Sequence, residues 1–456
     1  FSKRGLRANG TTSYDRTNYF ASFAANDENL RWYLSWQADV MVNSFIAKAD
    51  LDTEMTVVRN EFEAGENNPG RVLMQRTLGA MYDWHNYGKA TIGARTDIEN
   101  VDISRLQAFY RRHYQPDNAT LTVSGKFDTP RVLAWVAQYF GALPRPTRAL
   151  EATYTLDPPQ QGERQITVRR AGGTPLVYMM YHVPAAADPD FAAIQLLSLV
   201  LGDTPGGRLH KRVVEQRLAA QAFAGAFGLA EPGPLILGAG LAPGQDVASA
   251  RVAMAAVVDG LPKEPVTAEE LERARTSWLN GWEQGFTDPE QVGVALSEAI
   301  SQGDWRLYFL QRDRVRQLTL ADINRVAGTW LRRDNRTVGI YEPTTVPERA
   351  PQGQRVDVAA LVKDYRGDAA AAQAEAFDPT PATLDVRTQI TELGGMKVAL
   401  LPKITRGRVV HARLALRFGD EKSLFGLETV AGFAAFGKGD RIAHATPFRR
   451  FGIDLP

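Results

Sequence analysis

The chain has 456 residues, of which 44% are hydrophobic and 23% charged, and a length of this order corresponds to about two to four globular domains. Lysine plus arginine (53) nearly equals aspartate plus glutamate (52), so the formal net charge of +1 argues against a nucleic-acid or other polyanionic partner. The absence of cysteine excludes disulfides, thiolate zinc sites, iron–sulfur clusters and a cysteine nucleophile, although it does not distinguish a reducing from an oxidising compartment.

The first 125 residues contain strong helical signals followed by one strand signal. Leu30, Leu34 and Met41 recur at helix-like spacing, and the Asn-Asn-Pro-Gly run at 67–70 is a helix breaker. The expected elements are, in chain order, a helix over 26–44, a helix capped by Asp52 or Thr53, a helix that starts near Asp102 or Ser104, and a strand over 119–123 closed by Gly125.

The middle of the chain alternates irregularly between strand and helix signals. Such alternation, with antiparallel strands, favours α+β domains over a doubly wound fold. The expected elements are two strands within 165–182, a helix over 188–201, strands over 223–229 and 235–241, and a helix opened by the capping box Thr267-x-x-Glu270.

Two parts of the chain share a layout, which indicates an internal repeat. In both 101–123 and 318–340, a helix with apolar positions is followed by Asp-Asn and then by an apolar stretch. The Asp-Asn pairs at 117–118 and 334–335 are 217 residues apart, which sets the period. Chance similarity between two unrelated helix-turn-strand pieces is the alternative interpretation.

The period predicts how the chain divides into domains. We expect a first domain over 1–147, a second over 148–345, a linker over 346–381 and the start of a third domain over 382–456. The third is inferred because 388–400 and 409–417 again have the pattern of paired strands.

The first unit is shorter than the second, which predicts that residues are missing before Phe1. Asn335 and Asn118 are corresponding positions of the two units. In the second unit, 170 residues separate Gln165 from Asn335 (335 − 165), whereas in the first unit only 117 residues precede Asn118. About 50 residues are therefore expected to be missing if the units are comparable in length. No apolar run reaches the roughly 18 to 20 residues of a membrane span. No signal segment opens the chain, so any signal peptide would precede Phe1.

A helix predicted around 54–61 carries two glutamates seven residues apart. At about 100° per residue, Glu54, Glu61 and the two valines between them fall on one stripe, which places both carboxylates on the apolar face. Burying an unpaired carboxylate is costly, so such groups normally face a cation, a metal or a hydrogen-bond network. The alternative is that both glutamates border a solvated face, and their spacing alone does not decide between the two.

A series of positions in the first 128 residues follows a recognisable order and spacing. They are Gly5, Asn9, Thr12, Asp15, Thr17, Tyr19, Glu54, Glu61, Asn68-Pro69, His85, Tyr87, Gly93, Tyr114, Pro116, Asn118, Ala119, Gly125, Phe127 and Asp128. Together they resemble the pitrilysin/insulinase (M16) family of zinc peptidases. The second unit also resembles the next domain of that family, through Gly202, Gly207-Arg208-Leu209 and Glu215.

The resemblance implies roles for individual residues. Family members hold zinc with a His-x-x-Glu-His helix and the second glutamate of a downstream pair, and the motif's own glutamate activates the metal-bound water. Glu61 matches the third zinc ligand, and Glu54 matches the other glutamate, which orients a histidine ligand or the water. Asn9, Gly10 and Thr11 match an edge strand to which the substrate backbone adds, with Gly10 in place of the usual alanine.

The zinc-binding helix itself does not occur in the chain. No His-x-x-Glu-His is present among the 456 residues, and the family places it roughly 75 residues upstream of the position of Glu61, before Phe1. In the third unit, the motif would recur at 426–433, where Thr429, Gly432 and Phe433 replace ligands and base, as in a degenerate half. The six histidines lack metal-ligand spacing, and structural or exposed positions are expected for His85, His113, His182, His210, His411 and His444.

Two further motifs have structural interpretations. The glycine-rich run 202–208 lacks the Lys-Ser/Thr of a phosphate loop, so a turn between helices is favoured. The segment 246–261 is rich in alanine, valine and methionine at helical spacing, which is typical of core and not of a cofactor site.

The residues and the resemblance together predict α+β repeats with mixed, mostly antiparallel sheets and helices packed on one face. The implied function is zinc-dependent hydrolysis of peptides or unfolded polypeptides in a chamber closed by two facing halves, with one Zn²⁺ whose ligands lie mostly outside this chain. The second half would come from the same longer chain or from a second subunit. A bacterial periplasmic or other extracytoplasmic location is implied by the resemblance alone. The alternatives are a non-catalytic member that serves as the partner half, and a peptide-binding module that uses the Asn9 edge strand.

Overall fold

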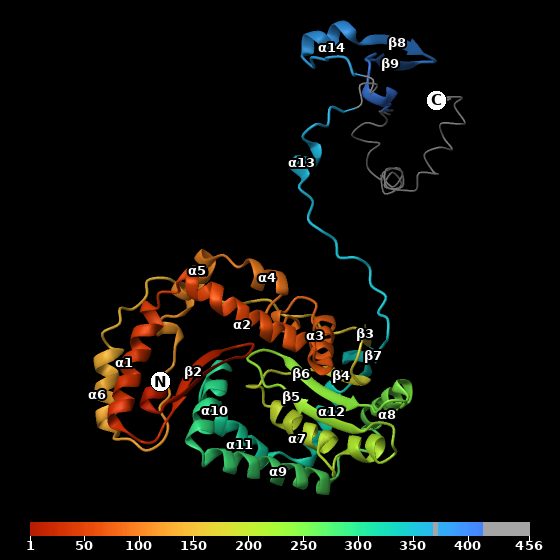
Figure 1. Cartoon of the computed structure of the whole chain (residues 1–456). Coiled ribbons are helices and arrows are strands. Elements are labelled where there is room, and N and C mark those ends of the chain that lie inside the picture. The colour runs from red at the N-terminus through yellow and green to blue at the C-terminus, as the bar shows by residue number, and fades with distance from the viewer. Residues whose placement is uncertain (368–372, 414–456) are drawn as a thin grey trace, which may run out of the picture. The chain divides into compact units, whose positions relative to one another are not determined.

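The computed structural model describes residues 1–367 and 373–413 (Figure 1). The chain divides into two compact units, Phe1–Ala350 and the residues from Pro351 onward. Among the described residues, none of the helices combines the length and the apolar character that a bilayer crossing requires.

The first 140 residues form a β-hairpin and a series of helices. β1 (Arg7–Thr12) pairs antiparallel with β2 (Thr17–Ser22). The predicted helix over 26–44 is confirmed, and the Asn26 side chain caps it by accepting from the Asn29 backbone N at 2.8 Å. The helices are η1 (Ser2–Arg4), α1 (Asp27–Asn43), α2 (Lys48–Glu66), α3 (Pro69–Met81), η2 (Asn86–Gly88), α4 (Arg95–Asn100), α5 (Ile103–His113), η3 (Pro116–Asn118) and α6 (Thr129–Tyr139).

A five-stranded mixed sheet is the centre of the rest of this unit. The strand order is β3-β7-β4-β6-β5, in which β3 and β7 are parallel and the other neighbours antiparallel. This confirms the predicted α+β fold with a mixed, mostly antiparallel sheet. The strands are β3 (Arg164–Arg170), β4 (Leu176–Val183), β5 (Gln221–Ala226), β6 (Gly233–Gly240) and β7 (Arg336–Pro343).

The sheet's own helices pack on one face, as predicted. α7, α8 and α12 contact its strands, and the predicted capping box at Thr267 and Glu270 opens α9. The predicted core role of 246–261 is also confirmed, because α8 buries Ala250, Met254 and Val258. The helices are α7 (Phe191–Gly202), η4 (His210–Val214), α8 (Val247–Asp259), α9 (Ala268–Phe286), α10 (Pro289–Ser301), α11 (Leu307–Gln317), α12 (Leu320–Trp330) and η5 (Arg333–Asn335).

The opposite face of the sheet is covered by α3, which comes from the first part of the chain (Figure 1). Side chains alternate along a strand, and β4 uses both of its faces. Val177 and Met179 belong to the core that contains α7, whereas Tyr178 and Met180 pack with Leu73 of α3. The sequence did not indicate that a helix also packs on this face. The apolar stripe of α3 predicts that one side of the helix is buried, but not which element it packs against.

Gly339 in β7 lets α3 approach closely. A Cβ at this position would lie 2.0 Å from Oγ1 of Thr77 and 3.1 Å from Cδ1 of Leu73. Both α3 residues are fully buried, so the missing side chain of Gly339 is a requirement of the packing.

The structure shows the helix and the turn of the predicted repeat in both units, and it corrects two sequence predictions. α5 and α12 have the same length and begin 217 residues apart, and each is followed by a short 3₁₀ turn at the Asp-Asn pair. The predicted strand at 119–123 is wrong, because this stretch pairs with no other strand in the described part of the chain. The corresponding stretch of the second unit is β7, which does pair and lies between β3 and β4. The predicted cap at Asp52 or Thr53 is also wrong, since α2 already starts at Lys48.

The second unit is described from Pro351 to residue 413, except for 368–372. Its elements are α13 (Val358–Val362), α14 (Pro381–Arg387), β8 (Gln389–Leu393), β9 (Met396–Leu400) and η6 (Arg406–Arg408). The prediction paired 388–400 with 409–417, whereas in the structure β8 and β9 form an antiparallel hairpin within 388–400 itself. Residues 409–413 are not in a strand, and the rest of the predicted strand at 409–417 and the degenerate motif at 426–433 lie outside the described residues. The domain boundaries after 147, 345 and 381 stay predictions.

We expect Gly339→Ala to lower the free energy of unfolding by about 1 to 3 kcal/mol, because the added methyl group overpacks the contact with α3. Urea unfolding measures this loss. Thr77→Ala removes the atom that the methyl group would meet, so the double variant should lose less stability than the two single variants do together. Strict additivity would contradict the tight contact between β7 and α3.

Candidate functional site

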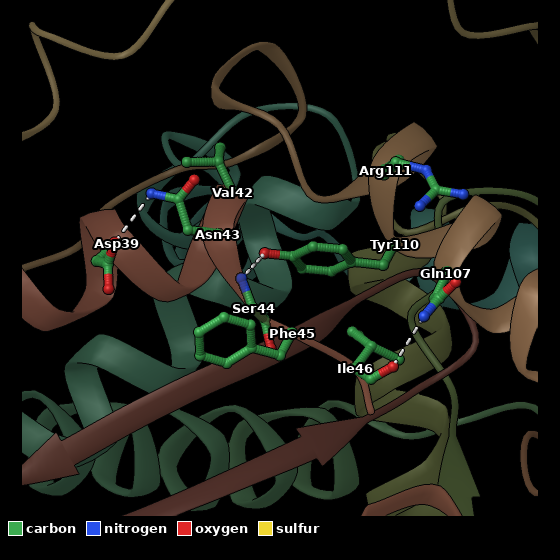
Figure 2. A pocket seen from close by; sticks show the side chains of 9 residues that line it. All are labelled: Asp39, Val42, Asn43, Ser44, Phe45, Ile46, Gln107, Tyr110 and Arg111. Atoms are coloured by element: carbon green, nitrogen blue, oxygen red, sulfur yellow. Dashed lines mark hydrogen bonds between the residues drawn. The ribbon is translucent and has the colours of Figure 1, made fainter. Parts of the chain in front are cut away.

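α2 carries both predicted glutamates, and α5 holds the loop from which it starts. The Tyr110 hydroxyl donates to the Val40 carbonyl O and accepts from the Ser44 backbone N, both at 2.7 Å. Gln107 Nε2 donates to the Ile46 carbonyl O at 3.0 Å. Figure 2 shows the contacts of Tyr110 with Ser44 and of Gln107 with Ile46 around a pocket of about 530 Å³, which none of the predicted site residues lines. The lining residues are Asp39, Val42, Asn43, Ser44, Phe45, Ile46, Gln107, Tyr110 and Arg111.

Glu54 and Glu61 are both exposed, which agrees with the second interpretation that the spacing left open, in which both glutamates border a solvated face. Leu51 is the buried residue of α2, and Met55 and Phe62 are half-buried beside it. Because these residues set the contact face, the two glutamates and Val57, which is 47% exposed, turn toward solvent. Within the described ranges, neither carboxylate forms a hydrogen bond or an ion pair.

Asn9, Gly10 and Thr11 lie on β1, all six residues of which are exposed. β1 pairs with β2 along one edge, and among the described residues no strand pairs with the other edge. Asn9 Oδ1 accepts from the Gly10 backbone N at 2.9 Å. The predicted residues therefore do lie together on a strand with an open edge, which can accept a further strand.

The described residues do not by themselves fit a zinc ion. No three histidine, cysteine or acidic side chains come together in residues 1–367 or 373–413 to hold a metal. Zinc in proteins takes three or four such donors, and the one predicted ligand here, Glu61, stands alone on α2.

Two of the histidines have structural contacts, as predicted. His85 Nε2 pairs with the Glu231 carboxylate, and its Nδ1 accepts from the Tyr87 backbone N at 3.1 Å. His182 Nε2 lies 3.1 Å from the Met81 carbonyl O, and burial lowers the pKa of His182. Arg208 in the glycine-rich run is likewise occupied, by the Glu270 carboxylate at 2.6 and 2.8 Å. The run itself forms a turn after α7, as predicted.

Asp157 fixes the loop that carries His85, and no sequence motif pointed to it. Its carboxylate accepts from the backbone N of Asp83, Trp84 and His85 at 2.7, 2.9 and 2.8 Å. Burial alone would raise the pKa of Asp157, but the three backbone donors outweigh it and hold the pKa below its usual value. The partners are separated by 72 to 74 residues, and Asp157 lies outside any helix or strand, so only the folded chain reveals the contact.

The comparisons with known proteins agree with this fold and with the motif positions. Residues 1–95 match the family model described as Insulinase (Peptidase family M16), and residues 100–277 match the Peptidase M16 inactive domain. The zinc protease PqqE of Helicobacter pylori is 25% identical over 340 residues, which cover 74% of this chain and 76% of that protein.

Two solved structures show the same fold. The crystal structure of a protease from Helicobacter pylori has a TM-score of 0.71 at 25% identity and covers 75% of this chain and 83% of that one. The first half of the periplasmic protease PqqL from Escherichia coli has a TM-score of 0.59 at 18% identity, with 75% and 77% covered. The chain belongs to the M16 (pitrilysin/insulinase) peptidase family, as its motif positions predicted.

We expect Asp157→Asn to lower the free energy of unfolding by about 1 to 3 kcal/mol at pH 7, because an amide cannot replace an acceptor of three backbone donors. The folded pKa of Asp157 lies below the unfolded one, so its contribution is present above the ordinary value of 3.8 and is lost as the pH falls through the folded pKa. The difference from the wild type should therefore shrink as the pH falls below 3.8 toward the folded pKa of Asp157. Urea unfolding at pH 7 and pH 3 tests this, with the exposed Asp50→Asn as the control; a loss of equal size at both pH values would contradict it.

Proposed function

We propose that this chain belongs to a zinc endopeptidase in which Glu61 is one ligand of the metal and Glu54 is the neighbouring carboxylate that orients a histidine ligand or the reacting water. The observation that carries the proposal is the position of both glutamates on one exposed face of α2, without partners in the described part of the chain. Relatives named zinc proteases support it. The remaining donors would come from outside the described residues.

We also propose that β1 is the edge to which the substrate backbone adds. An extended peptide can pair with the open edge of an exposed strand through main-chain hydrogen bonds, which suits peptides or unfolded polypeptides of varied sequence. The chamber around it would be closed by a second half, in the same longer chain or in a second subunit. PqqL is named a periplasmic protease whose first half was solved separately, and this supports a two-half, extracytoplasmic arrangement for the present protein.

A non-catalytic role is the second candidate, and one observation favours it. Residues 100–277 match the family model described as the Peptidase M16 inactive domain. In that case the chain would serve as the partner half or as a peptide-binding module.

We expect the 456-residue chain to retain no zinc and to cleave no peptide, because a single carboxylate is a weak metal site. Dialysis against metal-free buffer followed by elemental analysis measures the retained zinc. A stoichiometric amount would show that the chain completes a site by itself.

The roles of the two glutamates can be separated in a protein that includes the reading frame upstream of Phe1. Glu61→Gln should abolish zinc retention and peptidase activity, whereas Glu54→Gln should reduce activity by about 10- to 100-fold with a smaller loss of zinc. Glu63→Gln, which changes an exposed carboxylate elsewhere on α2, is the matched control.

Equal effects of the first two variants on zinc would contradict the assigned roles. An upstream frame that lacks His-x-x-Glu-His would sink the endopeptidase proposal and leave the non-catalytic one.

A further inference from the structure

One carboxylate ties the turn between β1 and β2 to two distant segments. Asp15 lies in this turn, which the Ser13 backbone N closes by donating to the Arg16 carbonyl O at 2.9 Å. Asp15 Oδ1 accepts from the Tyr87 hydroxyl at 2.6 Å, and Oδ2 accepts from the Ala230 backbone N at 2.9 Å. Both carboxylate oxygens are thus engaged, across 72 and 215 residues of sequence.

Tyr87 is a donor that its surroundings fix in place. The residue is 4% exposed, and its ring packs against those of Tyr14 and Tyr82 with centroids 5.3 and 6.0 Å away. Its hydroxyl also accepts from the Glu231 backbone N at 3.2 Å. Burial, together with the hydrogen bond to Asp15, raises the pKa of Tyr87 well above its ordinary value, so the hydroxyl stays protonated and keeps donating.

The residues next to Asp15 hold Thr11 of β1. Arg16 donates to Thr11 Oγ1 at 2.8 Å and pairs with Glu298 of α10. Asn18 Oδ1 accepts from the Thr11 hydroxyl at 2.6 Å and from its backbone N at 3.3 Å. Because these contacts come from the turn and from β2, they fix Thr11 without occupying the open edge of β1.

Arg16 and Asn18 in turn connect the hairpin to α10. Asn18 Nδ2 donates to Ser297 Oγ at 3.1 Å, and Figure 1 shows the hairpin running beside this helix. The open edge of β1 is therefore carried by a hairpin that is anchored at its turn and along β2, while β1 itself is exposed throughout.

We propose that Asp15 is a positioning residue for the peptide-binding edge of β1. By tying the turn to Tyr87 and to the Ala230 backbone, it holds Thr11 and its neighbours in the extended conformation with which a peptide backbone pairs. This inference rests on the proposed function of β1. The recognised group is the main chain of an extended peptide, because an edge strand offers backbone donors and acceptors.

Two variants of the full chain test the inference, with hydrogen–deuterium exchange and peptide affinity as readouts. Asp15→Asn keeps the shape of the side chain but leaves one donor without an acceptor, and Tyr87→Phe removes the hydroxyl while keeping the buried ring. In both, exchange at residues 7–12 should become about tenfold faster, as expected for one lost charge-assisted hydrogen bond. The Kd for a fluorescein-labelled, unstructured ten-residue peptide should rise by a similar factor. Exchange in β4 should not change, and Asp50→Asn, an exposed carboxylate on α2, should alter neither readout.

The two readouts separate the possible failures. Unchanged exchange over residues 7–12 in both variants would overturn the role of Asp15. Faster exchange with an unchanged Kd would show that Asp15 is merely structural, which would also overturn the inference. A third outcome is a wild-type chain that binds no peptide although exchange in β1 still responds to Asp15→Asn. This outcome would contradict the proposed function of the edge strand, and Asp15 would then position β1 without a role in peptide binding.

Discussion

The packing of α3 against the mixed sheet is the contact on which the rest of the first unit depends. α7, α8 and α12 cover one face of the sheet, and without α3 the other face would expose Tyr178, Met180 and Tyr341. Burying an aromatic or long aliphatic side chain contributes roughly 1.5 to 3 kcal/mol, whereas an exposed ion pair contributes about 1 kcal/mol or less. Each large side chain buried in the cluster around α3 therefore contributes more than a surface ion pair of this unit does.

The position of α3 determines where both parts of the candidate site lie. α2 precedes α3 with only Asn67 and Asn68 between them, and it packs against both α3 and α4. The loop after α3 leads to His85 and Tyr87, and Tyr87 reaches the turn of the β1–β2 hairpin. The edge strand and the glutamates are thus both connected to α3, in addition to the contacts of the hairpin with α10 and of the loop before α2 with α5.

Features that depend on neighbouring residues could be predicted from the sequence. The helix start near Asp102 and the capping box at Thr267 are confirmed, because a capping side chain bonds to a backbone group two or three residues away. The M16 family could be predicted because many motif positions occur in order. The helix and the turn that recur after 217 residues could be predicted, because the apolar spacing and the Asp-Asn pair that specify them are local.

Features that depend on distant partners could not be predicted. The apolar stretch at 119–123 has the composition of a strand, but a strand also needs a neighbour, which the described residues do not supply. The spacing of Glu54 and Glu61 shows that they share a face of α2, but not that this face turns toward solvent. Asp157 and the partners of Asp15 belong to no local sequence pattern. Their roles depend on contacts between residues that are far apart in sequence and meet only in the folded chain.

Native-state hydrogen exchange in α3 and β4 tests most directly the claim that α3 and the sheet form one cooperative structure. Under increasing urea, the most protected amides of both elements should converge on the same opening free energy, because neither can lose its packing without the other. Amides of α3 that open at a clearly lower free energy than those of β4 would show that the helix is a dispensable cover, and would contradict the account.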